Sequence, residues 1–376
     1  MKKALALGLG IASLVGLEAT SFAANDYGAK GPEATTTTNL PTSTGATGGK
    51  VIVPNGAGPY PILVASHGFS ASADNQVGWA QHFASWGFAV AVPSFPSPLM
   101  PDADKNSTII KDLVTYMATS LGAKVDAKKV GVEGHSAGGL ATTLAIAKAQ
   151  PQAVVLFDPV DRGGVGKTAY AAGCAPTLAL FADGSSCNVT GEWEGFRDQT
   201  PSELVAMHVV ASTHCDGENA DRGIACATFC GGGADKTRQA VYARYATAFF
   251  RARLSGDAEA EKLFDKTALA ADTAIANPLV KAATCTPVGP SSDAGVDSGS
   301  KPSSSSSSSG ATSSGGASSS SSGAGASSSG DPAGASGGDS SSGCACNASR
   351  TDRAGAFAVL AGAVALAAAT RRRRDR

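Results

Sequence analysis

The residues most able to do chemistry are centred on Ser136, in the run GHSAG at 134–138. A serine hydroxyl becomes a strong nucleophile only when a neighbouring base takes its proton, so its surroundings decide its role. The strand-like segment KVGVE precedes the run, and the helix-like segment GGLATTLAIAKA follows it. A strand, a sharp turn and a helix form the setting that exposes a nucleophilic serine above a sheet, and closely packed glycines such as Gly134 and Gly138 suit that turn. We therefore predict that Ser136 is a nucleophile.

A nucleophilic serine needs backbone N–H groups that stabilise the oxyanion of its tetrahedral intermediate. The N–H of Ala137 comes directly after Ser136 and at the start of the predicted helix, where the helix dipole adds partial positive charge. The segment SHGFS at 66–70 follows the buried-strand pattern ILVAS and contains the second candidate donor, the N–H of Phe69. The sequence thus predicts an oxyanion hole formed by Phe69 and Ala137.

Chain order selects the general base, because in this setting the serine, the acid and the histidine follow one another along the chain. His67 precedes Ser136 and lies in the expected oxyanion loop, so we predict a structural role for it. His208 lies inside the apolar strand pattern VAMHVV, where a packed histidine is expected. His214 follows that strand in the loop STHCDGEN and is therefore the predicted base.

Two aspartates compete for the role of the acid behind His214. Asp158 ends the strand pattern AVVLF, and Asp183 ends the strand pattern TLALFA. Either carboxylate can face the histidine from the carboxyl end of a strand, and the commonest arrangement favours Asp183. The residues alone leave this choice open.

The elements that must position these residues alternate along the chain. Buried-strand patterns occur at 50–54, 60–66, 88–94, 129–134, 153–157, 177–182 and 204–212, and helical patterns at 77–87, 107–121, 138–149 and 237–254. The helix at 237–254 should close the fold, and Ser107 is the expected N-cap of the helix at 107–121. The Thr-rich stretch 33–50 should hold edge strands or a linker. This alternation predicts an α/β protein with a mostly parallel central sheet flanked by helices.

Longer motifs resemble known families over about residues 50–254. The segment ILVASHGFSASADNQVGWAQHFASWGFAVAVPS and the run GHSAGG are similar to bacterial cutinases and polyester hydrolases, and GHSAGG, LFDPVD and HCDGENADRGIACATFC together resemble chlorophyllases. The resemblance implies the α/β-hydrolase fold and carboxylic-ester hydrolysis, without a cofactor or a metal ion. In the chlorophyllase-like and platelet-activating-factor acetylhydrolase-like pattern the acid lies in the DPV segment, which implies Asp158. Ser185 stands where polyester hydrolases carry their acid, which also argues against Asp183.

Substrate identity is less clearly encoded in the sequence. Leu99 and Met100 lie in the loop PSFPSPLMPDADKN, and Trp193 lies in the insertion CNVTGEWEGF. Apolar side chains near the nucleophile suit an ester with an apolar acyl or alcohol group, so these three are the predicted pocket residues. A non-catalytic surface-binding module that retains the fold is the alternative function.

Two further motifs point to ligands but fail on spacing. The run GGVGKT at 163–168 has Asp161 where a phosphate-binding loop needs glycine. The acidic run DGENAD at 216–221 lacks the spacing of a calcium loop, so we expect a solvated loop there. The 31 acidic and 30 basic residues nearly balance, and the central domain has no basic stripe, which argues against nucleic acid as a partner.

Both ends of the chain predict export. Residues 1–23 have the charged start, apolar run and small-residue cleavage site of a signal peptide. The catalytic domain is expected at 24–285, and we expect it to be monomeric. Residues 286–343 are rich in Ser and Gly, which predicts a disordered linker. Residues 344–376 combine a Cys motif, an apolar run and an Arg cluster, and resemble the surface-sorting tag of myxobacterial proteins. They imply a tether to the membrane or the cell surface.

Six of the eight cysteines fall inside the predicted domain, at 174, 187, 215, 226, 230 and 285. An even number in an exported protein predicts up to three disulfides, and the spacing does not select their pairing. A zinc site is the alternative, but the domain contains no CxxC pair to support it.

Overall fold

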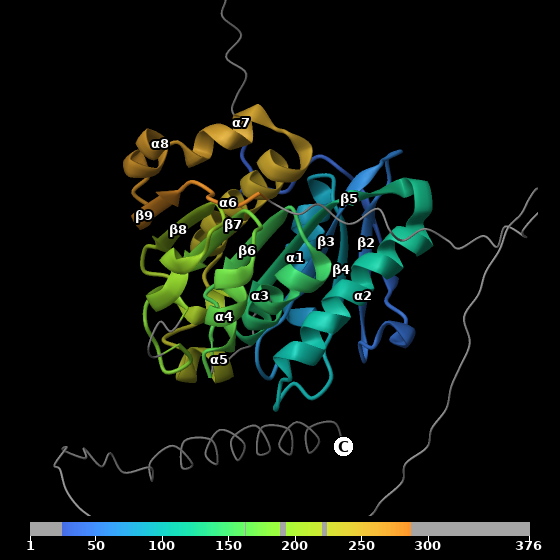
Figure 1. Ribbon diagram of the computed structural model, residues 1–376, viewed down its shortest axis with the longest axis horizontal. Coiled ribbons are helices and arrows are strands. Elements are labelled where there is room, and N and C mark those ends of the chain that lie inside the picture. The colour runs from blue at the N-terminus through green and yellow to red at the C-terminus, as the bar shows by residue number, and fades with distance from the viewer. Residues whose placement is uncertain (1–24, 162, 189–192, 220–223, 287–376) are drawn as a thin grey trace, which may run out of the picture. The chain divides into compact units, whose positions relative to one another are not determined.

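The computed structural model describes residues 25–161, 163–188, 193–219 and 224–286 (Figure 1). Its centre is one nine-stranded sheet with the order β1-β2-β4-β3-β5-β6-β7-β8-β9. The strands are β1 (Thr35–Asn39), β2 (Gly48–Pro54), β3 (Tyr60–Ser66), β4 (Ala89–Ser94), β5 (Val125–His135), β6 (Ala153–Phe157), β7 (Thr177–Phe181), β8 (Leu204–Val209) and β9 (Ile275–Lys281). The six strands from β4 to β8 in this order pair in parallel, and β1, β2 and β9 pair antiparallel. This arrangement confirms the predicted α/β-hydrolase fold.

Helices cover both faces of this sheet (Figure 1). The helices are α1 (Val77–Ser85), α2 (Ala103–Leu121), α3 (Ala137–Ala149), α4 (Val165–Ala172), α5 (Ile224–Phe229), α6 (Lys236–Ser255), α7 (Ala258–Glu261) and α8 (Lys266–Ala271). Apolar side chains of α1 and α6 form one buried cluster with the sheet. Those of α2, α3 and α4 form a second cluster on the opposite face.

The continuous apolar runs of the central strands follow from burial on both faces. Along β6, Val154 and Leu156 belong to one cluster, and Val155 and Phe157 belong to the other. Period-two alternation therefore places apolar residues on both sides, as expected for a parallel strand that helices cover on both faces. The carboxyl ends of these parallel strands meet at one edge of the sheet, where ligands bind in open α/β sheets.

Two expectations about helix limits and the end of the fold are wrong. The helix expected from Ser107 begins earlier, because Asp102 is its N-cap and accepts a hydrogen bond from the Lys105 N–H at 3.0 Å. The α6 helix does not close the fold, since α7, α8 and β9 follow it. Pro278 interrupts the apolar pattern of β9, and proline is tolerated there because β9 is an edge strand.

The six cysteines of the domain form three disulfides, which confirms the predicted number. The pairs are Cys174–Cys285, Cys187–Cys230 and Cys215–Cys226. The first joins the segment after α4 to the segment after β9, and therefore fastens the C-terminal edge of the domain. The sulfur atoms of Cys215, Cys226 and Cys230 lie within 4.8 Å of one another, but all three are used in disulfides rather than as free thiolates.

The predicted signal peptide, most of the predicted linker and the predicted C-terminal tag lie outside the described residues. Within the described residues, no helix combines the length and the apolar character needed to span a bilayer.

Candidate active site

Ser136 occupies a strained turn between β5 and α3. Its backbone angles are φ 56° and ψ −122°, a conformation that a non-glycine residue rarely adopts. The neighbouring glycines allow this turn because a Cβ at Gly134 would lie 2.4 Å from Thr142 Oγ1, and one at Gly138 would lie 2.5 Å from the His67 carbonyl oxygen. The turn therefore has the sharp geometry that presents a serine hydroxyl at the carboxyl end of a parallel strand.

His214 and Asp158 complete a buried chain of hydrogen bonds with Ser136. His214 follows β8 and begins the short 3₁₀ helix η5 (His214–Gly217). Its Nε2 lies 2.9 Å from Ser136 Oγ, and its Nδ1 lies 2.5 Å from Asp158 Oδ2. All three residues are buried. With Nδ1–H donating to the carboxylate, Nε2 is free to accept the serine proton.

Of the two candidate acids, only Asp158 contacts His214. Asp158 follows β6, has a φ of 39°, and accepts a second hydrogen bond at Oδ1 from the Ala182 N–H at 3.2 Å. Asp183 is exposed, and its backbone N–H donates to the Ser212 carbonyl. The structure therefore does not support the alternative assignment of Asp183.

The two predicted oxyanion donors lie on segments that flank Ser136. Ala137 is the first residue of α3. The loop before Phe69 packs directly on Ser136, since a Cβ at Gly68 would lie 3.1 Å from Ser136 Cβ. Within the described part of the chain, neither the Phe69 N–H nor the Ala137 N–H donates to another protein group. Both are therefore available to a ligand.

The other two histidines considered for the base have partners elsewhere. His67 Nε2 accepts the Phe95 N–H at 2.9 Å, and its Nδ1 lies 2.9 Å from the Gly68 carbonyl oxygen. This fixes a neutral tautomer that ties the oxyanion loop to the end of β4. His208 Nε2 lies 2.8 Å from Glu194 Oε1. Both positions fit the structural roles expected for these residues.

The acidic loop after His214 is buried rather than solvated, so that expectation is wrong for its first half. Asp216 is fully buried and accepts hydrogen bonds from the Thr213 N–H and the Asp235 N–H, both at 2.7 Å, and from Arg238 Nε at 2.6 Å. Glu218 is also buried and accepts a hydrogen bond from Asn75. An acidic run gives no sequence signal of such partners, because they come from α6 and from the segment before α1.

His135, which was not among the predicted site residues, contacts His214. Its Nε2–H donates to the His214 carbonyl at 2.9 Å, and the two rings lie 4.6 Å apart between centroids. Its Nδ1 lies 3.8 Å from a carboxylate oxygen of Glu218. His135 therefore holds the backbone of His214 in place through this hydrogen bond. Its position immediately before Ser136 was the available signal.

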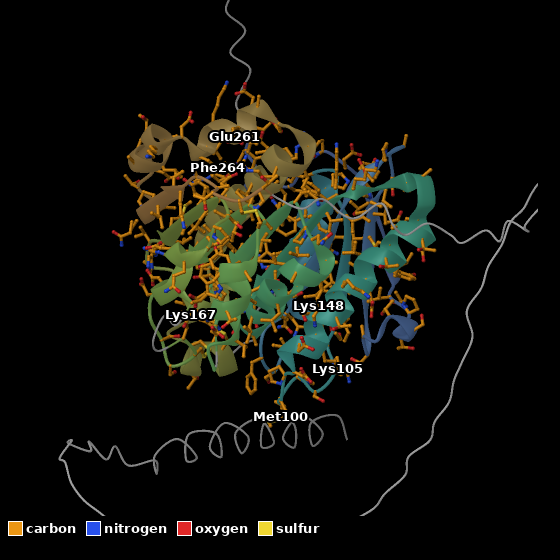
Figure 2. All side chains as sticks on the ribbon, viewed as in Figure 1. Met100, Lys105, Lys148, Lys167, Glu261 and Phe264 are labelled. Carbon is orange, nitrogen blue, oxygen red and sulfur yellow. A yellow bond between two sulfur atoms is a disulfide. The ribbon has the colours of Figure 1, made fainter. Side chains whose placement is uncertain are left out.

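The predicted pocket residues divide into two groups. Leu99 is 49% exposed and Met100 is 80% exposed. Figure 2 shows Met100 at the lower rim of the domain, beyond the start of α2. The preceding Pro98 carbonyl accepts the Ser70 N–H at 2.8 Å, so this loop adjoins the oxyanion loop. Trp193 is completely buried beside Tyr170 and Phe181, so it is a core residue and its assignment to the pocket wall is wrong.

Asp161 has a structural role in the segment that resembles a phosphate-binding loop. Its two carboxylate oxygens accept the backbone N–H groups of Gly166 at 3.0 Å and Lys167 at 2.9 Å. The aspartate therefore caps the first turn of α4 and occupies the position at which a phosphate would bind to a helix N-terminus.

A buried carboxyl group lies two residues before His135 on β5. Burial raises the pKa of Glu133 well above its usual value of 4.5, and the nearby Ser66 backbone offsets only part of this effect. Because the pKa of Glu133 is higher in the folded state, the protonated side chain stabilises the fold fully below about pH 4.5. This stabilisation is lost as the pH rises toward the folded-state pKa.

We expect Glu133→Gln to remove this pH dependence. Between about pH 4.5 and the folded-state pKa, the free energy of unfolding of the wild type should fall, relative to that of the variant, by about 1.4 kcal/mol per pH unit. Urea unfolding of both proteins at pH 5 and pH 8 measures the difference. An equal difference at the two pH values would show that Glu133 is ionised in the folded protein.

Comparison with known proteins shows a similarity to one family over part of the chain. Residues 22–178 match the family model described as Chlorophyllase. The matched segment includes Phe69, Ser136 and Asp158, and it ends before His214. No curated protein matches the chain. The sheet order and the match together identify the chain as an α/β-hydrolase-fold protein that is similar to the chlorophyllase family.

Proposed function

We propose that this protein is a serine hydrolase that cleaves carboxylic esters through an acyl-enzyme intermediate. The observation that carries the proposal is the continuous hydrogen-bond chain from Ser136 through His214 to Asp158. The match to the chlorophyllase family supports ester hydrolysis as the reaction class. The alternative, a binding module without activity, does not require this arrangement of a serine, a histidine and a buried carboxylate.

The geometry supports a two-step reaction. Ser136 Oγ attacks the ester carbonyl carbon while His214 Nε2 takes the hydroxyl proton, and Asp158 stabilises the resulting imidazolium. The N–H groups of Phe69 and Ala137 stabilise the oxyanion, which is worth about 3 kcal/mol for each donor in other serine hydrolases. His214 then protonates the departing alcohol. Water, activated by the same imidazole, cleaves the acyl-enzyme and releases the acid.

The surroundings of Ser136 favour a substrate with an apolar acyl or alcohol group. Leu99 and Met100 are exposed apolar side chains on a loop that is hydrogen-bonded to the oxyanion loop. We propose that this loop contacts the substrate, because large exposed apolar side chains suit substrates that are not fully hydrated. We further propose that the enzyme is exported and that the region after residue 286 holds it at the membrane or the cell surface, as its composition predicts.

We expect the oxidised, disulfide-bonded protein to release p-nitrophenol from acetyl, butyryl and octanoyl esters. A fluorophosphonate probe should label one serine, which peptide mass spectrometry should map to Ser136, because only an activated serine reacts with such probes. Heat-unfolded protein is the control for non-specific labelling. If the folded protein neither hydrolyses these esters nor reacts with the probe, the binding-module alternative is favoured.

A further inference from the structure

We propose that Asn188 is a positioning residue that fixes the carboxylate of Asp158, and that it acts on catalysis through Asp158 and His214. The inference rests on the proposed function. Asn188 follows β7, is buried, and lies with its Nδ2 3.0 Å from Asp158 Oδ1. The Ala182 N–H contacts the same oxygen at 3.2 Å. Asp158 Oδ1 therefore has two donors, and Oδ2 remains for His214.

A carboxylate that orients a histidine must be held against rotation about its Cβ–Cγ bond. The 2.5 Å contact of Asp158 Oδ2 with His214 Nδ1 fixes one oxygen only. Two donors on Oδ1 define the plane of the carboxylate and so the direction in which Oδ2 faces the imidazole. Hydrogen bonds to the ionised form also favour a charged carboxylate in a buried site.

The hydrogen bonding of the Asn188 side chain indicates that its amide N–H₂ group is oriented to donate to Asp158. Its Oδ1 is buried and has no hydrogen-bond partner among the described residues. The reversed amide orientation would place this oxygen against Asp158 Oδ1, where two acceptors repel. A buried acceptor without a partner costs free energy, and a side chain that merely fastened a loop would be expected to use both ends of its amide.

The chain around Asn188 is itself fixed. The neighbouring Cys187 is bonded to Cys230, after α5, and the Asn188 N–H donates to the Ser185 carbonyl at 3.1 Å. The α5 helix also carries Cys226, which is bonded to Cys215, the residue next to His214. Two disulfides thus link the loop of Asn188 and the loop of His214 to the same short helix. The positions of Asn188 and of His214, which both contact Asp158, are therefore linked through α5.

The test compares Asn188→Asp and Asn188→Leu with the wild type, and Asn39→Asp on the exposed strand β1 is the matched control. The first variant preserves the shape and replaces the donor with a second carboxylate, and the second removes the donor. We expect kcat for p-nitrophenyl butyrate to fall about 10- to 100-fold with KM within about twofold, which is the size of effect seen when side chains that orient metal ligands in enzymes are replaced. Asn39→Asp should match the wild type.

Two further measurements separate positioning from general destabilisation. Asn188→Asp places a second carboxylate against buried Asp158, and two adjacent carboxylates share a proton, so the acidic limb of the kcat/KM profile should differ from that of the wild type. The far-downfield proton resonance of the His214 Nδ1–H···Asp158 hydrogen bond should shift or disappear in both variants, and this spectrum is recorded without substrate. An unchanged resonance and acidic limb, with any loss of kcat matched by a lower folded fraction, would overturn the proposal. Absence of hydrolysis by the wild type together with a shifted resonance in the variants would refute the proposed function while supporting the positioning role.

Discussion

Asp158→Asn is expected to lower kcat by about 10⁴-fold, while Asp183→Asn should leave it within about twofold. The reason is the 2.5 Å contact between His214 Nδ1 and Asp158 Oδ2. An amide at this position no longer stabilises the imidazolium, and it can turn its N–H₂ group toward Nδ1, which would select the tautomer that cannot accept the Ser136 proton. Asp183 is exposed and does not contact His214, so the same change there removes no part of the hydrogen-bond chain.

Steady-state hydrolysis of p-nitrophenyl butyrate by the two variants measures this difference. Thermal unfolding of each variant gives the folded fraction for which kcat must be corrected. KM should change little, because neither aspartate is expected to contact the ester in its ground state. The assignment of the acid would be wrong if Asp158→Asn kept most of its activity, or if Asp183→Asn lost it.

The parts of the site that could be predicted from sequence are those determined by local geometry. The glycines around Ser136, the preceding strand and the following helix specify a single turn, so the sequence predicts the turn that carries Ser136 and the position of the Ala137 N–H directly. The order of strands places His214 after β8, at the same edge of the sheet as Ser136. The choice between Asp158 and Asp183 needed a family resemblance, because both residues follow neighbouring strands and periodicity treats them alike.

The remaining features depend on contacts between distant segments. Asn188 lies thirty residues from Asp158, and Asn75 lies 143 residues from Glu218. Neither spacing has a period that a sequence pattern could reveal. Trp193 lies in a mostly polar segment, yet its ring is buried in the core against Tyr170 and Phe181. The disulfide pairing was equally inaccessible, since six cysteines allow fifteen connectivities.

The second large effect is expected at Asp216, which holds the turn that carries His214. Asp216→Asn should lower the free energy of unfolding by about 3 kcal/mol. The carboxylate is fully buried and accepts from the N–H groups of Thr213 and Asp235 and from Arg238. An amide has only one acceptor oxygen, so it must leave a buried donor unsatisfied and place its own N–H₂ group near another donor.

The same change should reduce kcat about tenfold in the molecules that remain folded, which corresponds to about 1.4 kcal/mol of transition-state stabilisation. Asp216 and Thr213 bond reciprocally, since Thr213 N–H donates to the carboxylate and Asp216 N–H donates to the Thr213 carbonyl. These bonds fix the backbone on both sides of His214. Without them the imidazole should spend less time within hydrogen-bond distance of Ser136 Oγ.

Urea unfolding and ester hydrolysis on the same samples test both effects, with Asp198→Asn as the matched control. Asp198 is mostly exposed and lies 3.6 Å from the Arg197 guanidinium, so its loss should cost less than about 1 kcal/mol. Arg238→Gln should cost less than Asp216→Asn, because the Arg238 side chain is 25% exposed and water can replace part of its interaction. If Asp216→Asn destabilised the protein no more than Asp198→Asn, the buried carboxylate would not be what holds the His214 turn. If stability fell but kcat did not, the turn would keep its geometry without this carboxylate, because the disulfide at Cys215 and the hydrogen bond from His135 would be enough to position His214.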